Sequence, residues 1–383
     1  MYGLRFYEVA IFYWGFNMRT YDVAVLAGDG IGVDVTDAAF AIIDAVTAHI
    51  GGISVKRCDI RAGAGFYSQE GFDIEDGGEE RSGQADAIFV GAIGLPSIRW
   101  PDGTEIAPHL RLRERFQLYA GVRPVKAYSG TPARLSDARA SLIDLVILRE
   151  STEGLFYSAA VHNRTHLQSD EEVQEILRIT RSTTEKLHDF AFKLARKRAR
   201  RGGKNLVTCV DKANVFRSMA FFRNIFDEVS TGHQDVRKGY NYVDAQALDL
   251  IRQPWEFDVL VMENMFGDIL SDLAGGLVGG MGMAACAEIG DNHGLFQPAH
   301  GSAPDIMGQD RANPLASILS AALMLDYLAD RADCEKTREA AEMIEDLIEK
   351  AFDNRALRPM EFGGDMGTKA ITNTLLDYVK QGG

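Results

Sequence analysis

Residues 263–272 read ENMFGDILSD and carry two carboxylates at helical spacing. Asp268 and Asp272 stand four positions apart, in a segment whose apolar residues recur with the period of a helix. Both carboxylates are therefore expected on one helical face, about one turn apart. Hard divalent cations such as Mg²⁺ and Mn²⁺ prefer carboxylate oxygens, so the pair predicts a metal site. The alternative is an acidic bias that complements the helix dipole.

The next segment, LAGGLVGGMGM at 273–283, is too rich in glycine for an ordinary surface helix. Glycine lets two stretches of backbone approach closely and gives the chain conformational freedom. We therefore expect close packing, or a hinge, where the helix ends.

Length and composition indicate a globular protein of about two domains. The chain has 383 residues, of which 46% are hydrophobic and 25% charged. A net charge of −14 argues against general binding to nucleic acid or to an anionic membrane. The cysteines Cys58, Cys209, Cys286 and Cys334 are scattered without CxxC spacing, which argues against disulfides or a zinc site and predicts a reducing, cytoplasmic setting.

Residues 1–18 are rich in aromatic side chains and differ in composition from the rest of the chain. The stretch lacks a preceding basic region and a cleavage site, and it is too short for a membrane span. We expect Met18 to be the true initiator. The alternative is a hydrophobic extension that packs on the fold or on a partner.

From Tyr21 onward, β-rich runs alternate with helical patterns. A strand over 21–27 leads into the turn GDGIG at 28–32 and a helix over 33–50. This turn lacks the later glycine of the dinucleotide fingerprint, so we do not expect a Rossmann fold. The further strand-like runs are 85–92, 142–148, 205–210 and 257–262. The alternation predicts an α/β fold with a largely buried sheet.

Arginines gather in HLRLRERFQLYAGVRP at 109–124. Arg113 and Arg123 lie here, and Arg149 follows the next predicted strand. Arginine forks bind carboxylates in bidentate geometry, so converging arginines would form a pocket for a di- or tricarboxylic acid. For Arg111 and Arg115 we expect a solvated helix face instead.

Several motifs now occur in an order that identifies a family resemblance. Between about Tyr21 and Leu376 the chain resembles the β-decarboxylating dehydrogenases of the isopropylmalate, isocitrate and tartrate dehydrogenase family, closest in type to the isopropylmalate enzymes. The motifs are GDGIG, LRLR with VRP, RESTEG at 149–154, VDKANV at 210–215, YVDA at 242–245, NMFGDILSD and HGSAPDIMG at 300–308. The resemblance implies two α/β domains that flank a cleft. The outer, cofactor-binding domain would comprise 1–117 and 279–383, and the inner domain 118–278, with the metal site and the dimer interface.

The resemblance also implies roles for individual residues. The substrate-binding residues would be Arg113, Arg123, Arg149, His109 and Leu110. The metal ligands would be Asp268, Asp272 and Asp244, and the catalytic residues Lys212, Asp244 and Tyr157. Lys212 and Asp244 match residues that such enzymes contribute from the partner subunit, which implies a homodimer with shared active sites.

The motif HGSAPDI resembles the adenosine-binding loop of the family. The residues that it and the segment after it would contribute are His300, Gly301, Ser302, Ala303, Asp305, Ala312 and Asn313. Asp305 occupies the position that faces the adenosine ribose. A carboxylate there accepts hydrogen bonds from a 2′-hydroxyl but repels a 2′-phosphate, so NAD is expected over NADP.

The implied reaction is oxidation of a 2-hydroxy acid with subsequent loss of CO₂, with Lys212 or an aspartate as the base. The family's tyrosine acid falls at Phe156, and Tyr157 is its neighbour. In an extended segment the two side chains would point to opposite faces. Three alternatives remain: a local shift lets Tyr157 act, water or Lys212 protonates the product, or oxidation alone is the main activity. A catalytically silent, ligand-binding subunit is a further hypothesis.

In the family that the chain resembles, the residues before the LR arginine select the substrate's 3-substituent, and here this segment reads EIAPHLRLR at 105–113. Ile106 and Leu110 are candidates to line an apolar pocket for an alkyl group, whereas His109 could hydrogen-bond a hydroxyl group, as in tartrate. We therefore predict an isopropylmalate-type enzyme, with a tartrate or D-malate type as the alternative. The basic run 196–204 is expected to end a helix, where positive charge complements the dipole.

Overall fold

The structure is a computed structural model that describes residues 18–132, 134–159 and 167–382. The prediction for the aromatic-rich N-terminus therefore lies outside the described residues, apart from exposed Met18. No described helix is long and apolar enough to cross a membrane.

Ten strands of the described chain form one mixed sheet in the order β2-β1-β3-β12-β11-β4-β5-β10-β8-β9. The strands are β1 (Arg19–Gly28), β2 (Ile53–Asp59), β3 (Ala87–Ala92), β4 (Ala120–Lys126), β5 (Asp144–Glu150), β8 (Leu206–Asp211), β9 (Arg237–Tyr242), β10 (Val259–Met262), β11 (Ala285–Ile289) and β12 (Gly294–Pro298). A separate hairpin pairs β6 (Leu167–Gln168) with β7 (Val173–Gln174).

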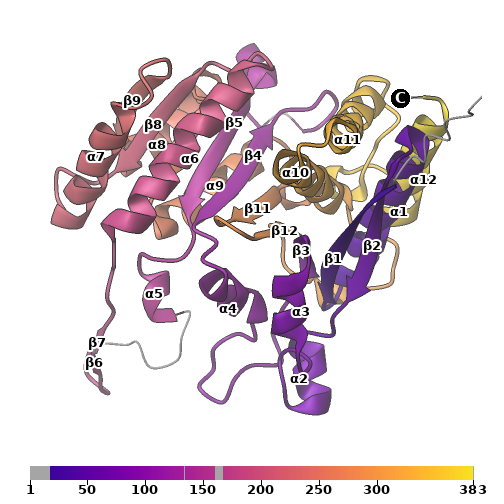
Figure 1. Cartoon of the computed structure of the whole chain (residues 1–383), viewed down its shortest axis with the longest axis horizontal. Coiled ribbons are helices and arrows are strands. Elements are labelled where there is room, and N and C mark those ends of the chain that lie inside the picture. The colour runs from indigo at the N-terminus through magenta and orange to yellow at the C-terminus, as the bar shows by residue number, and fades with distance from the viewer. Residues whose placement is uncertain (1–17, 133, 160–166, 383) are drawn as a thin grey trace, which may run out of the picture.

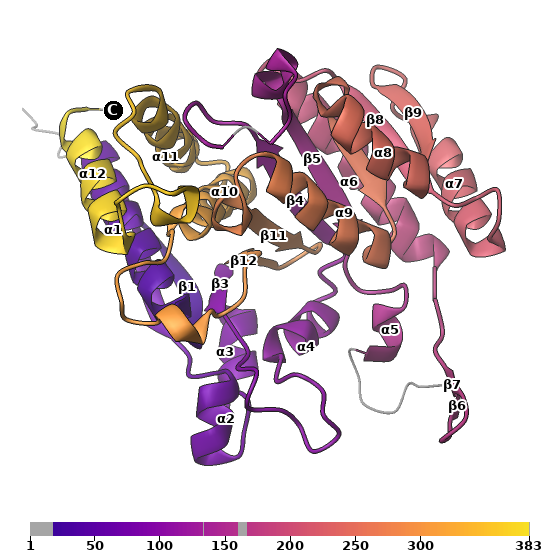
Figure 2. The same ribbon diagram turned by 180° about the vertical axis from the view of Figure 1, so that it is seen from behind.

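Helices pack on both faces of this sheet. They are α1 (Gly32–Ile50), α2 (Ala64–Glu70), α3 (Gly78–Gln84), α4 (Pro108–Arg115), α5 (Phe156–Ala159), α6 (Arg181–Ala199), α7 (Arg217–Ser230), α8 (Val243–Arg252), α9 (Asn264–Leu277), α10 (Leu315–Ala332), α11 (Glu335–Asp353) and α12 (Thr368–Lys380). Figures 1 and 2 show α6 over one face of the sheet at β5, and α9 over the opposite face. Covering both faces explains why strands such as β3 are buried along their whole length.

The predicted alternation of strands and helices is confirmed. Each predicted strand run overlaps an observed strand, and the helix expected over 33–50 is α1. The glycine-rich run begins within α9 and continues beyond its end. It is closely packed at Gly282, where a Cβ would lie 2.0 Å from Oε2 of Glu361, whereas a Cβ on Gly276 would meet open space. Gly279 and Gly280, with φ of 147° and 143°, take the chain out of the helix.

The strand order separates the middle of the chain from its two ends. Strands β4, β5, β10, β8 and β9 come from residues 120–262, and the other five strands of the sheet come from before or after that range. The two sets meet where β11 pairs with β4, antiparallel, through three residue pairs from Ala287↔Val122 to Ile289↔Ala120. This junction is the one place where the main sheet of the described chain joins the two sets.

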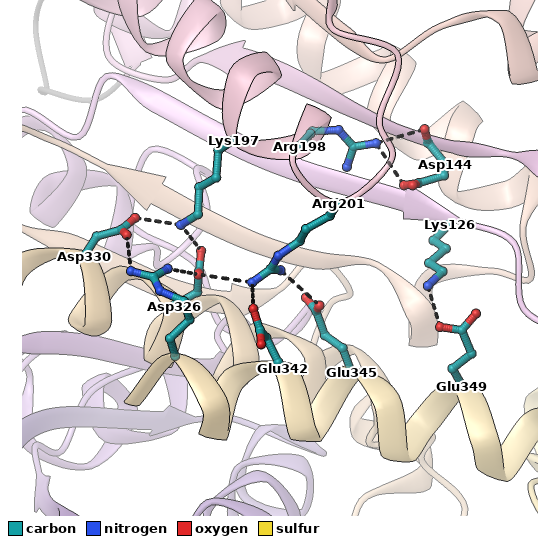
Figure 3. Close-up of polar contacts among 11 residues, drawn as sticks. Lys126, Asp144, Lys197, Arg198, Arg201, Asp326, Asp330, Glu342, Glu345 and Glu349 are labelled. Carbon is teal, nitrogen blue, oxygen red and sulfur yellow. Dashed lines mark hydrogen bonds and ion pairs between the residues drawn. The ribbon is translucent and has the colours of Figure 1, made fainter. Parts of the chain in front are cut away.

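A second link between the two sets is ionic. Figure 3 shows the C-terminal part of α6 facing α10 and α11. Lys197 Nζ lies 2.6 Å from Oδ2 of Asp326 and 2.7 Å from Oδ2 of Asp330, and Arg201 pairs with Glu342. The basic run 196–204 therefore does more than complement a helix dipole, because its side chains reach acidic groups on the other set of elements.

Charge substitutions at the end of α6 separate these two roles. Replacing Lys197 by Gln removes contacts with two carboxylates, so we expect the free energy of unfolding to fall by about 1 kcal/mol at low salt. The loss should shrink in about 1 M NaCl because the ions screen the pairs. Urea unfolding at both salt concentrations measures it.

Arg200→Gln is the matched control. It removes one positive charge from the same helix end, where Arg200 is exposed and has no ion pair within the described residues. An equal loss in both variants would show that the dipole, and not the ion pairs, matters.

Candidate active site

Three neighbouring strands, β11, β4 and β5, bring charged residues together on the face of the sheet at Gly121. In the sheet, Glu288 on β11 stands opposite Gly121 on β4, which in turn stands opposite Arg149 on β5. Directly opposite residues project to the same face, and so does Arg123, two positions beyond Gly121. The pairing alone therefore places Glu288, Arg123 and Arg149 in one row.

Gly121 leaves the space that this row needs. A Cβ there would lie 2.5 Å from Oγ of Ser151 and 2.9 Å from Oε2 of Glu288. Both distances are too short for real contacts, so a larger residue would displace the Glu288 carboxylate.

Arg113 enters the same site from α4. Its NH2 group lies 3.0 Å from Oε1 of Glu288, and NH2 of Arg123 lies 3.4 Å from the same oxygen. The two arginine side chains are 7% and 9% exposed, and Glu288 is fully buried. The structure thus brings together the three arginines predicted to bind substrate, since Arg149 belongs to the same row.

The other two arginines of α4 behave differently. Arg111 pairs with Asp73 and Glu79, and Arg115 with Glu79 and Glu80. Both arginine side chains are 39% exposed. They lie on the partly solvated face of the helix, as expected, and bind acidic residues there.

Burial and mutual repulsion govern the electrostatics of the site. Burial, and then the charge of Arg113, lower the pKa of Arg149 to about 10, while the Asp268 carboxylate opposes this. Burial alone would raise the pKa of Glu288, but Arg113 and Arg123 outweigh it and hold that pKa below its usual value. Glu288 is therefore a carboxylate stabilised by the arginines around it.

Helix α9 adds the predicted metal carboxylates to this face. Glu263 caps the helix by accepting hydrogen bonds from the backbone N–H groups of Met265 and Phe266. Asp268 pairs with Arg149. Partial burial and the Asp268 carboxylate raise the pKa of Asp272. Two repelling carboxylates one turn apart fit a divalent cation, which would neutralise both.

Within one chain, the third predicted metal ligand, Asp244, does not join Asp268 and Asp272. Among the described residues, no group of three or more His, Cys, Asp or Glu side chains comes together as a metal site. Asp244 on α8 instead accepts a hydrogen bond from Lys212 at 2.5 Å. No hydrogen bond or ion pair of the described chain joins Lys212 or Asp244 to the buried arginines. One copy therefore holds two of the three predicted ligands together.

Phe156, not Tyr157, contacts the arginine cluster. The Phe156 ring centre lies 4.8 Å from Cζ of Arg149, whereas the Tyr157 ring centre lies 4.6 Å from Cζ of Arg178. The expectation of an extended segment here was wrong, because these residues form the single-turn helix α5. Successive side chains of a helix diverge by about 100°, so the two rings still face different groups.

The residues before Arg113 are only partly placed as predicted. Leu110 lines a small cavity of about 10 Å³ together with Arg113 and Phe156. Ile106, the other candidate to line an apolar pocket, is fully buried in the protein. Burial, and then Arg113, lower the pKa of His109 to about 3, so its imidazole is neutral. Its Nδ1 is buried without a hydrogen-bond partner among the described residues.

The predicted cofactor loop packs on the GDGIG turn. The N–H of Ile31 donates to the carbonyl of Ser302 at 2.8 Å, and a Cβ on Gly30 would lie 2.0 Å from that oxygen. Ser302 in turn donates a hydrogen bond to the carbonyl of Gly94. The glycine turn that failed the dinucleotide fingerprint therefore supports the loop around 300–306.

A cavity of about 300 Å³ lies beside this loop. Among its lining residues are Ile31, His300, Ile306, Arg311, Ala312 and Asn313. His300 Nδ1 donates a hydrogen bond to the carbonyl of Gly301 at 2.9 Å, and its buried Nε2 has no partner among the described residues. An unpartnered polar atom in a largely apolar cavity fits the heterocycle of a bound nucleotide.

Of the other predicted cofactor residues, Asn313 lines the cavity, whereas Gly301, Ser302, Ala303 and Asp305 do not. Ala303 has a left-handed φ of 35° and precedes the single 3₁₀ turn Pro304–Ile306, in which Asp305 is exposed. Asn313 donates to Oε2 of Glu361 at 2.9 Å. Asp305 thus lies next to the lining residue Ile306 without lining the cavity itself.

Two buried glutamates beside the arginines, Glu288 and Glu150, were not predicted from the sequence. Glu288 stands in the apolar run ACAEI, where only its isolation as a buried acid could have drawn attention. Glu150 accepts hydrogen bonds from both N–H and Oγ1 of Thr152, each at 2.7 Å. Burial raises the pKa of Glu150 to about 7.

The site is thus a group of buried guanidiniums beside a carboxylate pair, an arrangement that suits an acid with several carboxylates and a cation. A family model described as isocitrate/isopropylmalate dehydrogenase matches residues 22–379, and the chain belongs to this family. A 3-isopropylmalate/3-methylmalate dehydrogenase of Methanocaldococcus jannaschii is 37% identical over 361 residues, covering 94% of this chain and 99% of the relative. A homoisocitrate dehydrogenase of the same organism is 36% identical over 365 residues, covering 94% and 98%.

Comparison with solved structures leads to the same family. The chain resembles isocitrate dehydrogenase from Methylococcus capsulatus with a TM-score of 0.80 at 32% identity, covering 94% of this chain and 100% of that one. The predicted family and α/β fold class are confirmed. The protein is an oxidative decarboxylase of 3-substituted malates, and enzymes of its family use NAD or NADP with a divalent metal.

The raised pKa of Glu150 predicts a pH-dependent stability. The unfolded carboxyl ionises near 4.5 and the folded one near 7, so stability is full below 4.5 and is lost as the pH rises to about 7. A Glu150→Gln variant lacks this loss. We expect its advantage over the parent to grow by on the order of 2–3 kcal/mol between about pH 5 and pH 8. Urea unfolding across that range measures it, and a constant difference would contradict the assignment.

Proposed function

We propose that the enzyme catalyses the NAD-dependent and divalent-cation-dependent oxidation of a 3-substituted malate and its subsequent decarboxylation, with the isopropylmalate type as the leading candidate. The observation that carries this proposal is the convergence of Arg113, Arg123 and Arg149, all buried, on one face beside Asp268. Such guanidinium groups bind and orient the carboxylates of a malate.

The cofactors fit residues of this chain. Asp268 and Asp272 would hold the divalent cation, together with Asp244 from a second copy, and His300 to Asn313 would hold NAD. When bound, the cation supplies Lewis acidity and NAD supplies the hydride acceptor. Asp305, next to the lining residue Ile306, supports NAD, whereas the cation Arg311 lines the cavity itself and would attract a 2′-phosphate.

Proton transfer falls to Lys212, whose Nζ donates a hydrogen bond to Asp244 in the same chain. As the base, Lys212 would act in its neutral amine form, which takes the proton of the substrate's 2-hydroxyl group. The final protonation of C3 would come from Tyr157, from Lys212 or from water. The contact between Phe156 and Arg149 puts a ring without a hydroxyl group at the arginines, so Tyr157 must move from Arg178 to act there.

The site needs a second copy if Lys212 and Asp244 act on the partner's substrate. We propose the domain division 1–117 with 279–383 and 118–278, which the strand order supports, and a homodimer built on the inner domain. Exposed apolar side chains gather on its helices: Leu248 and Ile251 on α8 are 53% and 45% exposed, and Ile269 on α9 is 60% exposed. Exposed apolar residues clustered on adjacent helices are typical of an interface.

A charge on this surface should separate the copies. We expect Leu248→Arg to run as a monomer in size-exclusion chromatography with light scattering, and to lose at least about tenfold in kcat because the shared site is incomplete. Phe72→Arg is the control, since Phe72 is 69% exposed but lies between α2 and α3. A monomeric parent would overturn the dimer.

The function itself is tested by NADH formation with Mn²⁺ across isopropylmalate, tartrate, D-malate and isocitrate, with CO₂ release measured in parallel and NADP as the alternative cofactor. We expect NADH with NAD and one dicarboxylic substrate, and a ratio of CO₂ to NADH near one. NADH without CO₂ would show that the decarboxylation step is lost. Absence of turnover despite Mn²⁺ binding that Asp272→Asn abolishes would favour the silent-subunit alternative.

A further inference from the structure

We propose that Glu288 is a specificity-determining residue: its carboxylate takes the place of one substrate carboxylate among the buried arginines and restricts the enzyme to dicarboxylic malates, against tricarboxylic hydroxy acids. This inference rests on the proposed function and deepens it. It concerns the number of negative charges that the site accepts, whichever 3-substituent is preferred.

The contacts of Glu288 are those of a bound carboxylate. One oxygen, Oε1, lies 3.0 Å from Arg113 and 3.4 Å from Arg123, and the thiol of Cys286 donates to it at 3.4 Å. Both arginines keep a buried Nε without a partner among the described residues. Each guanidinium group is therefore only partly used by the protein and retains donors for a ligand.

The second oxygen of Glu288 faces the same space. Oε2 is buried without a hydrogen-bond partner among the described residues, and it lies 2.9 Å from the place where a Cβ of Gly121 would be. A negatively charged acceptor in this position repels a further carboxylate. The gap at Gly121 and the acid at Glu288 thus act together: one provides the room and the other decides which charge can enter.

Charge counting gives the consequence. Arg113, Arg123 and Arg149 provide three positive charges, and Glu288 offsets one of them. Asp268 also touches Arg149, but the proposed function assigns its charge to the cation. Two positive charges remain, which match the two carboxylates of a 3-substituted malate. A third substrate carboxylate would be buried without a counter-charge, which is costly.

The location of Glu288 supports a dedicated role. Its strand β11 is otherwise apolar, with the sequence ACAEI and every residue buried. An ionised glutamate is stable there only because arginines from two other elements, α4 and β4, meet it. An amide or a hydroxyl group could occupy the same position without this charge.

The test is the substrate preference of Glu288→Gln, which removes the charge and keeps the shape. For each variant, kcat/KM is measured with isopropylmalate and with isocitrate and homoisocitrate. We expect the ratio of tricarboxylic to dicarboxylic kcat/KM to rise at least about tenfold in Glu288→Gln. Glu288→Asp, which keeps the charge, should retain the parent's preference. Glu288→Ser replaces the Gln variant if that protein does not fold.

Glu150→Gln is the matched control. Glu150 is a buried carboxylate at the same end of the sheet, but its hydrogen bonds go to Thr152, Glu153 and Asn264 and not to an arginine. Its loss should leave the ratio unchanged. An equal rise in this variant would show that any buried acid has the same effect and would overturn the proposal.

A binding measurement separates this inference from the proposed function. The rise in Tm caused by isocitrate and by malate, without NAD, is compared for the parent and Glu288→Gln. A larger rise in Tm with isocitrate in Glu288→Gln than in the parent supports the inference, even if neither protein turns over any substrate. The absence of turnover would count against the proposed function alone. The inference would be overturned if the two ligands raised the Tm in the same proportion in both proteins, or if isocitrate already raised the Tm of the parent more than malate does.

Discussion

The structure depends on the burial of three arginines near the middle of a ten-stranded sheet. Taking an ion out of water costs several kcal/mol, so Arg113, Arg123 and Arg149 are tolerable only with acidic partners close by. Glu288 and Asp268 are those partners, and they arrive from β11 and α9. The need for charge compensation therefore fixes how α4, β11 and α9 must pack around β4 and β5.

Strand pairing supplies the precision that this compensation requires. A one-residue slip between β4 and β11 would turn Glu288 to the opposite face of the sheet and leave the arginines without it. The glycine at 121 and the short β11–β4 junction hold that register. Chemistry that involves residues from both ends of the chain and from its middle is thus assembled by the backbone before any ligand is present.

The features of the fold and the site that depend on residues close together in the sequence could be predicted. The helix of Asp268 and Asp272, the five strand runs and the importance of three arginines came from spacing and motif order. Glu288 could not be found this way, since its meaning comes from Arg123, 165 residues away in the chain. The sequence also did not predict the single-turn helix at Phe156 or the complete burial of Ile106, because tertiary packing and not local propensity decides both.

The route of the chain through the sheet has a consequence for how the protein is made. Strand β3 pairs with β12, about two hundred residues later, so β1 to β3 must wait for the last third of the chain before their edge is covered. Residues 120–262, by contrast, contain all partners of β5, β10, β8 and β9. On the ribosome the middle of the chain can therefore fold first, while the early strands remain exposed to aggregation until synthesis is nearly complete.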